Sequence, residues 1–315
     1  MQKAKPDHGI SISAVERETG LAKDTLRVWE RRYGFPRPER DPNGDRLYPE
    51  VQIARLRLVK RLMDRGMRPG RLLALDGPAL AELAQEPSGS AAPRTALHDL
   101  ALFLLKTHQA GELRRELVQV LMRDGVKRFV IDTAAPLTVH AGEAWTRGEL
   151  QIFEEHLLTE VLQSVLRQAI AQLGTPLAAP VILFTTLPDE RHGLGLLMAE
   201  AMATLEGAHC VSLGTQTPVR DIVAAATAQG VDIVALSVSA NASPGQVEES
   251  VRLLRGELPA AIGLWCGGAG AVRLKRLGEG VEVLSALDDV AAALERWHAM
   301  RGVAPDLSAG VANAC

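Results

Sequence analysis

The 315-residue chain has few cysteines, and none of them stands in a pairing pattern. Cys210, Cys266 and Cys315 are far apart and form no CxxC motif. This scarcity excludes a disulfide framework and a zinc site built from thiolates. We therefore expect the cysteines to be small core residues, with Cys315 a free thiol.

Long apolar runs are also missing. No stretch approaches the roughly 18 consecutive apolar residues of a membrane span, and the first residues, MQKAKPDHGISIS, lack the apolar segment of a secretion signal. Neither insertion into a membrane nor export is indicated. We expect a cytoplasmic protein with no membrane partner.

The net charge is small, at −3, but the two signs are unevenly distributed. Residues 1–75 contain 17 Lys and Arg against 10 Asp and Glu, whereas the remaining residues contain 18 against 28. A basic excess in one part of a chain is typical of a surface that meets a polyanion. Because solvated surfaces are also often basic, charge alone leaves both interpretations open.

Periodicity and composition predict several domains that combine all-α and α/β structure. Residues 1–78 hold short helical patterns, and the stretch QEPSGSAAP predicts a flexible linker over 79–93. Four helical segments over 94–175 suit a four-helix bundle. Residues 176–303 alternate β-branched runs with amphipathic helices, which predicts a doubly wound, Rossmann-like parallel sheet. Residues 304–315 are expected to form a disordered tail.

Five short apolar runs are the candidate strands of this sheet. In open α/β sheets, ligands bind in the crevice beyond the carboxyl ends of the strands, so polar residues just after a strand are candidate site residues. The five runs are VILFTT (181–186), HCVSLG (209–214), DIVALS (232–237), AIGLWCG (261–267) and VEVL (281–284).

The basic segment contains a helix-turn-helix pattern followed by a hairpin signal. Gly20 ends one helix, and a second helix follows after a short turn. In this geometry the second helix enters the major groove of DNA. Asn43-Gly44 lies between basic and aromatic residues, which predicts a type I′ hairpin that forms a wing. The second helix carries Lys23, Thr25, Arg27, Arg31 and Arg32, and the wing carries Arg40 and Arg46.

The motifs TLRVWERRYG and GDRLY in this segment resemble the DNA-binding domain of MerR-family transcription regulators over about 70 residues. The resemblance implies that Lys23 and Arg27 meet bases or phosphates. It also implies that Arg40, Arg46 and Tyr48 contact the flanking DNA backbone. The alternative, a solvated basic helix with Trp29 and Tyr33 as core, accounts for the aromatic residues but not for the wing.

A second motif lies where the first candidate strand ends, in VILFTTLPDERHGLGLLMAEAM. Pro188 breaks the strand, and Glu190 and His192 precede a helix start. A loop histidine that is merely hydrogen-bonded to Glu190 is one interpretation. The other is a metal-ligating imidazole whose second nitrogen is held by that carboxylate. No set of neighbouring residues completes a zinc site, so such a metal would bring most of its own ligands.

The pattern Glu190-x-His192-x-x-Gly195 resembles the DxHxxG signature of cobalamin-binding domains, with Glu in place of Asp. The resemblance implies that His192 is the lower axial ligand of cobalt. Two later signatures of that family match in part: ALSVSAN carries Ser237, with Ser239 where Leu is usual, and CGGAG carries the glycine pair. In the family, small residues at these positions leave room for the nucleotide tail of the cofactor. They are Ser237, Gly267 and Gly268.

A third motif lies in the predicted bundle, where nine residues separate Trp145 from the pair Glu155 and His156. This Wx9EH pattern resembles the CarH/LitR family of cobalamin-dependent, MerR-type light-responsive repressors. The resemblance implies that Trp145 covers the upper face of the corrin and that the pair hydrogen-bonds an upper ligand such as 5′-deoxyadenosyl. The alternative places Trp145 in the bundle core and the pair on the surface. The histidine that family members carry after the tryptophan is Thr146 here, and His140 is the nearest alternative in sequence.

Together the resemblances cover nearly the whole chain and imply a regulator rather than an enzyme. We expect it to bind double-stranded promoter DNA and adenosylcobalamin, to form a dimer or tetramer, and to respond to light as a repressor. One alternative is a MerR-type regulator that carries another tetrapyrrole, or none, and acts through a partner. The other is a corrinoid methyl carrier, against which the basic winged segment argues.

Overall fold

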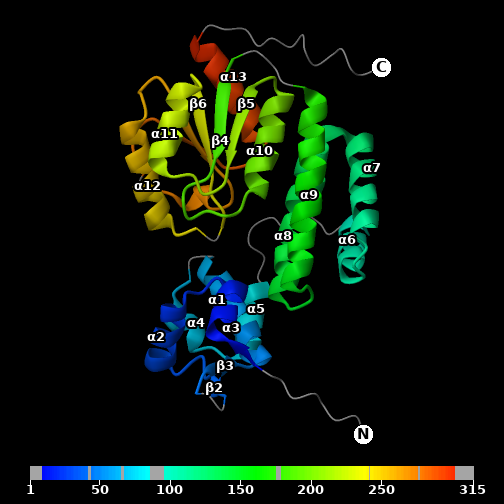
Figure 1. Cartoon of the computed structure of the whole chain (residues 1–315), viewed down its shortest axis with the longest axis vertical. Coiled ribbons are helices and arrows are strands. Elements are labelled where there is room, and N and C mark those ends of the chain that lie inside the picture. The colour runs from blue at the N-terminus through cyan, green and yellow to red at the C-terminus, as the bar shows by residue number, and fades with distance from the viewer. Residues whose placement is uncertain are drawn as a thin grey trace. The chain divides into compact units, whose positions relative to one another are not determined.

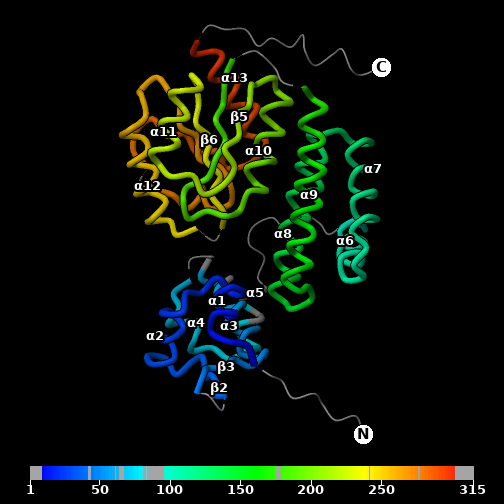
Figure 2. Tube along the Cα trace, in the orientation of Figure 1, coloured from blue at the N-terminus to red at the C-terminus, as the bar shows by residue number. Residues whose placement is uncertain are grey.

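A computed structural model of the chain describes residues 9–41, 44–64, 67–85, 96–174, 179–240, 242–275 and 277–301 (Figures 1 and 2). Packing divides the chain into two compact units. The N-terminal unit comprises residues up to Leu102 together with Val139–His156, and the C-terminal unit comprises Phe103–Thr138 and the residues from Leu157 onward.

The N-terminal unit begins with the predicted helix-turn-helix. Helix α1 (Ile12–Thr19) starts where the side chain of Ser11 accepts a hydrogen bond from the Ala14 N–H, and it ends at Gly20, which has φ 67°. Helix α2 (Lys23–Tyr33) follows directly. The two helices bury Val15, Leu26 and Trp29 in a core shared with the rest of the unit. The predicted helix-turn-helix is therefore present.

A small antiparallel sheet in the order β1-β3-β2 forms the wing. Strand β3 (Arg46–Tyr48) pairs with β1 (Ile10–Ser11) on one side and with β2 (Glu39–Arg40) on the other. A hairpin thus connects β2 and β3 as predicted. Asn43, on which the predicted turn type depends, lies outside the described residues.

The predicted boundary at residue 78 is wrong. After α3 (Glu50–Asp64) and α4 (Pro69–Leu73), helix α5 spans Gly77–Gln85 and enters the region predicted as linker. Its Leu80 is fully buried in the core of the N-terminal unit. Helix α5 therefore belongs to the folded domain, because its apolar face completes that core. The rest of the predicted linker and the predicted tail lie outside the described residues.

All four helical segments predicted for residues 94–175 form helices, although they do not form a single unit. Residues 96–102 and Val139–His156 belong to the N-terminal unit. Residues Phe103–Thr138 and the helical residues from Leu157 onward belong to the C-terminal unit. A π-helical segment, Phe129–Ala134, follows Gly125, whose φ of 77° and ψ of 167° interrupt the α-helical geometry. The α-helices are α6 (Ala96–Lys106), α7 (Ala110–Arg128), α8 (Ala135–Thr146) and α9 (Ile152–Leu173).

The C-terminal unit contains the predicted parallel sheet, and each of the five candidate runs forms a strand. The order β5-β4-β6-β7-β8 places the first strand beside the third, so the chain changes direction next to β4. Helices α10 and α13 pack together on one face and α11 and α12 on the other (Figure 1). The strands are β4 (Val181–Thr185), β5 (His209–Gly214), β6 (Ile233–Ser237), β7 (Gly263–Gly267) and β8 (Val281–Leu284). The covering helices are α10 (Leu194–Leu205), α11 (Val219–Ala228), α12 (Pro244–Glu257) and α13 (Asp289–Arg301).

The core of the sheet explains why its strands could be predicted. Apolar residues of β4, β6 and β7 are buried under α11 and α12, while Phe184 and Trp265 are buried on the other face. A sheet covered on both faces needs nearly continuous apolar strands. Cys266 is buried and Cys210 is half-buried, and burial raises the pKa of both thiols to about 12. Among the described residues, no helix is both long and apolar enough to cross a membrane.

Candidate functional site

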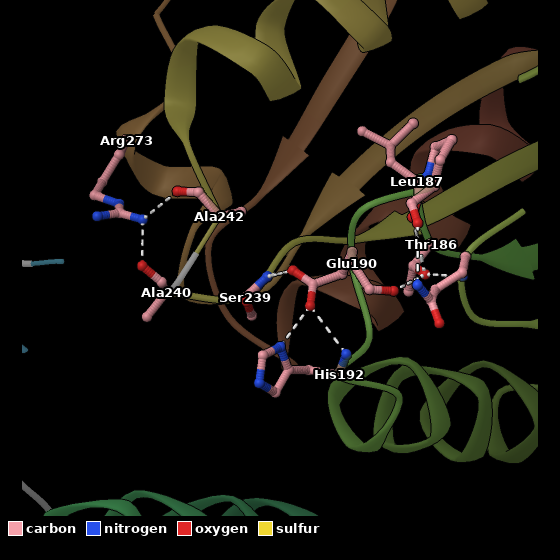
Figure 3. A network of polar contacts seen from close by, with 10 residues as sticks. Thr186, Leu187, Glu190, His192, Ser239, Ala240, Ala242 and Arg273 are labelled. Carbon is pink, nitrogen blue, oxygen red and sulfur yellow. Dashed lines mark hydrogen bonds and ion pairs between the residues drawn. The ribbon is translucent and has the colours of Figure 1, made fainter. Parts of the chain in front are cut away.

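The loop between β4 and α10 brings Glu190 and His192 together at the carboxyl end of the sheet. Oε1 of Glu190 accepts a hydrogen bond from the His192 backbone N–H at 2.9 Å and lies 2.6 Å from Nδ1 of the imidazole. The carboxylate is buried, at 7% exposure, whereas the His192 side chain is 59% exposed. The loop therefore holds the imidazole by one nitrogen and presents the ring to the outside (Figure 3).

The second oxygen of Glu190 reaches another loop. Oε2 accepts a hydrogen bond at 2.9 Å from the backbone N–H of Ser239, which follows β6. Burial alone would raise the pKa of Glu190, but the hydrogen bonds from His192 and Ser239 outweigh it and hold the pKa at about 2. Glu190 is thus an anion at neutral pH and favours the tautomer in which His192 Nδ1 carries the proton.

A buried hydroxyl fixes the backbone of the same loop. Thr186 is fully buried, and its Oγ1 donates to the Glu190 carbonyl oxygen at 2.7 Å while accepting from the Gln216 N–H at 2.8 Å. The hydroxyl therefore ties the loop after β4 to the loop after β5. Because both of these hydrogen bonds are to the main chain, Thr186 fixes where the Glu190 side chain begins.

The small residues predicted to line the site lie at the same end of the sheet. A Cβ added to Gly195 would meet Ser237 Oγ at 3.2 Å, so the first turn of α10 closely approaches the end of β6. Gly268 has φ 97°, and a Cβ there would lie 2.5 Å from the Val238 carbonyl oxygen. The backbone itself thus requires glycine at position 268. At Gly267 a Cβ would meet only ordinary van der Waals contacts, at 3.7 and 3.8 Å.

These residues fit a metal that arrives with most of its own ligands. With Nδ1 engaged by Glu190, Nε2 of His192 is the ring nitrogen directed away from the loop (Figure 3). Within the described ranges, no three His, Cys, Asp or Glu side chains gather as a metal site. A single oriented imidazole could supply one nitrogen ligand to a metal whose other ligands belong to a corrin ring.

The residues of the Wx9EH pattern lie in the N-terminal unit. Nδ1 of His156 is 3.0 Å from Oε2 of Glu155, so these two form a pair, and His156 is 69% exposed. Trp145 is half-buried, and its ring lies under the guanidinium of Arg57, 5.9 Å from Cζ to the ring centroid. Arg57 also forms ion pairs with Glu18 at 2.7 Å and Glu50 at 3.1 Å. Trp145 is therefore in contact with the winged domain.

Thr146 and His140, the two positions considered for a second histidine ligand, are both held by contacts with other residues. Thr146 is buried and donates its hydroxyl to the Gly142 carbonyl oxygen at 2.7 Å. The ring of His140 packs against that of the buried His98, with centroids 4.6 Å apart and a 41° angle between the planes. Neither side chain is thus a freely rotating surface group.

The predicted recognition helix presents its basic residues outward. Arg27 pairs with Asp24 one turn away at 3.1 Å, and Arg31 is exposed. Lys23 lies at the helix start, where its ammonium is 3.5 Å from Glu16, and Thr25 is half-buried beside it. Such partly solvated pairs exchange readily for phosphate contacts, because exposed ion pairs contribute little free energy.

On the wing, two of the three predicted contacts are accessible. Arg40 is exposed, and its Nη1 donates to the Gly44 carbonyl oxygen at 2.7 Å. Arg46 is half-exposed and pairs with Glu30 of α2 at 3.0 Å, which ties the wing to the recognition helix. The prediction that Tyr48 contacts DNA is wrong for this structure. Its side chain is fully buried in the core, and burial, followed by the charge of Glu30, raises its pKa.

Sequence patterns did not reveal several residues that shape these sites. Thr186 and the Ser239 N–H act through hydrogen bonds between loops, and no spacing rule indicates them. Gly270 was visible within CGGAG, and a Cβ there would lie 2.2 Å from the Ser239 carbonyl oxygen. Arg57 reads as one more basic residue of an amphipathic helix, although only 9% of it is exposed. Only the structure shows that Arg57 is buried, and this burial is what distinguishes it from the other described basic residues of the helix.

Comparison with known families gives two matches. A model described as MerR HTH family regulatory protein matches residues 10–72, and one described as B12 binding domain matches residues 100–170. The first match covers the helix-turn-helix, the wing and α3. The second covers helices α6 to α9.

Relatives resemble the chain over most of its length. The HTH-type transcriptional repressor CarH of Myxococcus xanthus is 30% identical over 276 residues, which cover 85% of this chain and 91% of that protein. The HTH-type transcriptional repressor CarA of Myxococcus xanthus is 28% identical over 230 residues, covering 72% and 76%. Among solved structures, the monomethylamine corrinoid protein of Methanosarcina barkeri superimposes with a TM-score of 0.52 at 14% identity. That match covers 64% of this chain and 98% of the other, and it shows the fold alone.

Proposed function

Because the chain belongs to the CarH family of cobalamin-binding, MerR-type transcriptional repressors, we propose that it is a light-responsive repressor that senses through adenosylcobalamin. Membership of this family makes it a transcription regulator rather than an enzyme. The observation that supports the cofactor proposal most strongly is the Glu190–His192 pair at the carboxyl end of β4. When bound, adenosylcobalamin supplies a cobalt–carbon bond that visible light cleaves.

His192 holds the lower face of the cofactor in this proposal. Its Nε2 is directed away from the loop, and the anionic Glu190 keeps the proton on Nδ1, which makes Nε2 the electron-pair donor. Gly195, Ser237, Gly267 and Gly268 keep the adjacent end of the sheet free of large side chains. At Gly267 the backbone would accept a larger residue, so glycine there leaves space that a bound cofactor can use.

Trp145, Glu155 and His156 serve the upper, adenosyl side in this proposal. A tryptophan offers a flat apolar face, and the paired Glu155 and His156 offer an acceptor and a donor for hydroxyl or amine groups. Trp145 also lies under Arg57 of the winged domain, which supports a link between the cofactor and the DNA-binding surface. The indole N–H of Trp145 is buried and has no hydrogen-bond partner among the described residues.

DNA is bound by α2 and the wing. Lys23, Thr25, Arg27 and Arg31 occupy the helix that enters the major groove, and Arg40 and Arg46 reach the flanking phosphates. Domains of this type read two half-sites as a dimer, so we propose a homo-oligomer, a dimer or tetramer, on double-stranded promoter DNA. Trp145 would contact the adenosyl side of the bound cofactor, so a change at that side would alter the position of Trp145 and, through it, the assembly that holds DNA.

The test compares one preparation with and without adenosylcobalamin, in the dark and after green or blue illumination. We expect cobalamin-like visible absorption after gel filtration, promoter binding in the dark and a lower oligomer mass with weaker binding after light. Promoter binding that is equally tight without any cofactor would instead favour a regulator that acts through a partner. The likeness to a corrinoid protein does not favour a methyl carrier, because such a carrier has no use for a winged domain.

A further inference from the structure

An arginine on the far side of the β6 loop belongs to the hydrogen-bond network that ends at His192. Arg273 closes the short helix η2 (Ala271–Arg273) after β7. Its Nη2 donates to the carbonyl oxygens of Ala240 at 2.5 Å and Ala242 at 3.2 Å, both in the loop after β6 (Figure 3). A planar guanidinium that bonds two carbonyls holds the loop at both of those residues.

The same loop is held from the other side by backbone packing. The Gly270 N–H donates to the Val238 carbonyl oxygen at 3.0 Å, and the Val238 N–H donates to the Gly267 carbonyl oxygen at 2.9 Å. A Cβ at Gly270 would lie 2.2 Å from the Ser239 carbonyl oxygen. The loops after β6 and β7 are therefore in backbone contact. Arg273 adds side-chain hydrogen bonds from the second loop to Ala240 and Ala242 of the first.

Glu190 uses this fastened loop to orient His192. One carboxylate oxygen accepts both hydrogen bonds from His192, and the other accepts the hydrogen bond from the Ser239 N–H. A carboxylate that bridges two loops keeps its orientation only while both loops are fixed. The chain of contacts thus runs from Arg273 through the β6 loop and Glu190 to the imidazole (Figure 3).

We propose that Arg273 is a positioning residue for His192: it holds the loop after β6 at Ala240 and Ala242, so that the Ser239 N–H orients Glu190, which in turn orients the imidazole. The significance of this arrangement for the cofactor rests on the proposed function. The arrangement itself concerns only the hydrogen bonds of the C-terminal unit, so it can be tested without cofactor.

Arg255 provides a matched control in the same unit. Its guanidinium also donates to backbone carbonyls, those of Ile262 at 2.6 Å, Leu258 at 3.0 Å and Pro259 at 2.7 Å. These carbonyls belong to the connection between α12 and β7, which enters the sheet at the amino ends of the strands. Replacing Arg255 therefore removes a similar set of hydrogen bonds without touching the β6 loop.

The first measurement is the tautomer of His192 in the cofactor-free, full-length protein, read from the ring nitrogen shifts by NMR at about pH 9, where histidine is neutral. The His192→Gln spectrum assigns the signals. We expect the Nδ1–H tautomer in the wild type and in Arg255→Gln. In Arg273→Gln we expect a shift toward the Nε2–H tautomer that predominates in free histidine, and in Arg273→Lys a smaller one.

An unchanged tautomer in both Arg273 variants, or an equal shift in Arg255→Gln, would overturn the proposal. Because Arg273→Lys keeps a cationic donor, it serves as the informative variant if Arg273→Gln does not fold. A general loss of structure would shift the His192 tautomer ratio in the Arg255 and Arg273 variants alike. Loss of positioning would shift that ratio only in the Arg273 variants.

The second measurement is a double-mutant cycle on adenosylcobalamin affinity in the dark. Changing residues that orient a metal ligand typically costs 10- to 100-fold in affinity, so we expect about 10-fold for Arg273→Gln and for Glu190→Gln. If Arg273 acts through Glu190, adding Arg273→Gln to Glu190→Gln should cause no further loss. Two losses that multiply would contradict the chain of contacts. A wild-type protein that binds no cobalamin would refute the proposed function while leaving the tautomer test intact.

Discussion

The DNA-binding surface and the Glu190–His192 loop are built on opposite principles. On α2, Arg27 bonds Asp24 one turn away, and both side chains are largely exposed. In the loop, the carboxylate of Glu190 is buried and accepts hydrogen bonds from two separate loops. A polyanion is met by charge that can rearrange, whereas a single imidazole ligand must be oriented before the cofactor arrives.

This difference implies different responses to substitution. Phosphate contacts contribute individually, so the loss of one arginine should weaken DNA binding by a limited amount. The proposed cofactor binding through His192 depends on a single nitrogen, so loss of that nitrogen should abolish retention of the cofactor.

His192→Ala should abolish or greatly weaken retention of cobalamin, by more than about 100-fold, because it removes the nitrogen that we propose binds the cofactor rather than a residue that orients it. The measurement is visible absorption after gel filtration, with circular dichroism to show that the fold persists. Since His192 is largely exposed, the fold should not depend on it. An unchanged spectrum and affinity would remove His192 from the site.

Trp145→Ala should make the dark protein behave like the illuminated wild type, with DNA affinity lower by about 10-fold, a typical allosteric coupling. The indole is the group proposed to sense the adenosyl side, and it also lies under Arg57. Oligomer mass and promoter affinity, each in the dark and after light, are the measurements. If this variant kept the full light response, Trp145 would not be the residue that transmits the signal.

Arg40→Ala and Arg46→Ala should each lower the slope of log K against log salt by about 0.9, the value for one phosphate contact. We expect a larger affinity loss for Arg46→Ala, because it also frees the carboxylate of Glu30 beside the DNA. Arg252→Ala, at an exposed arginine of α12, is the control. If both wing variants keep the wild-type affinity and slope, the wing does not contact DNA.

Tyr48→Phe should leave DNA affinity unchanged and raise the free energy of unfolding by about 1 kcal/mol. The Tyr48 hydroxyl is buried and has no hydrogen-bond partner among the described residues, so its removal relieves a desolvation cost. Chemical denaturation and a promoter titration measure the two quantities. A loss of DNA affinity in Tyr48→Phe would show that the Tyr48 hydroxyl contacts DNA despite its buried position.

The sequence was most informative where one physical rule governs a whole segment. The three central strands β4, β6 and β7 were predictable because a sheet covered on both faces requires continuous apolar runs. The edge strands β5 and β8 are less buried and were predicted from their β-branched residues. Helix α5 was missed because the linker predicted from the stretch QEPSGSAAP was drawn back to residue 79, although α5 begins at Gly77 with Pro78 in its first turn, where proline is common. Strands β1 and β2 hold two residues each, too few to show a period.

For the site, residue spacing predicted the pair but not what holds it. Glu190 and His192 are two residues apart, so their contact is local. Ser239 and Arg273 reach the pair through backbone groups of separate loops, and main-chain hydrogen bonds leave no mark in side-chain patterns. Tyr48 was misjudged because a motif identifies a residue type but not whether the side chain faces the core or the solvent.

The most direct test of the account is a promoter titration with one protein preparation in four states: cofactor-free, loaded with adenosylcobalamin in the dark, loaded and illuminated, and the His192→Ala variant mixed with cofactor. We expect tight promoter binding only in the loaded dark state and weak binding in the other three. Equal promoter affinity in all four states would contradict the claim that a cofactor held by His192 controls this DNA-binding domain.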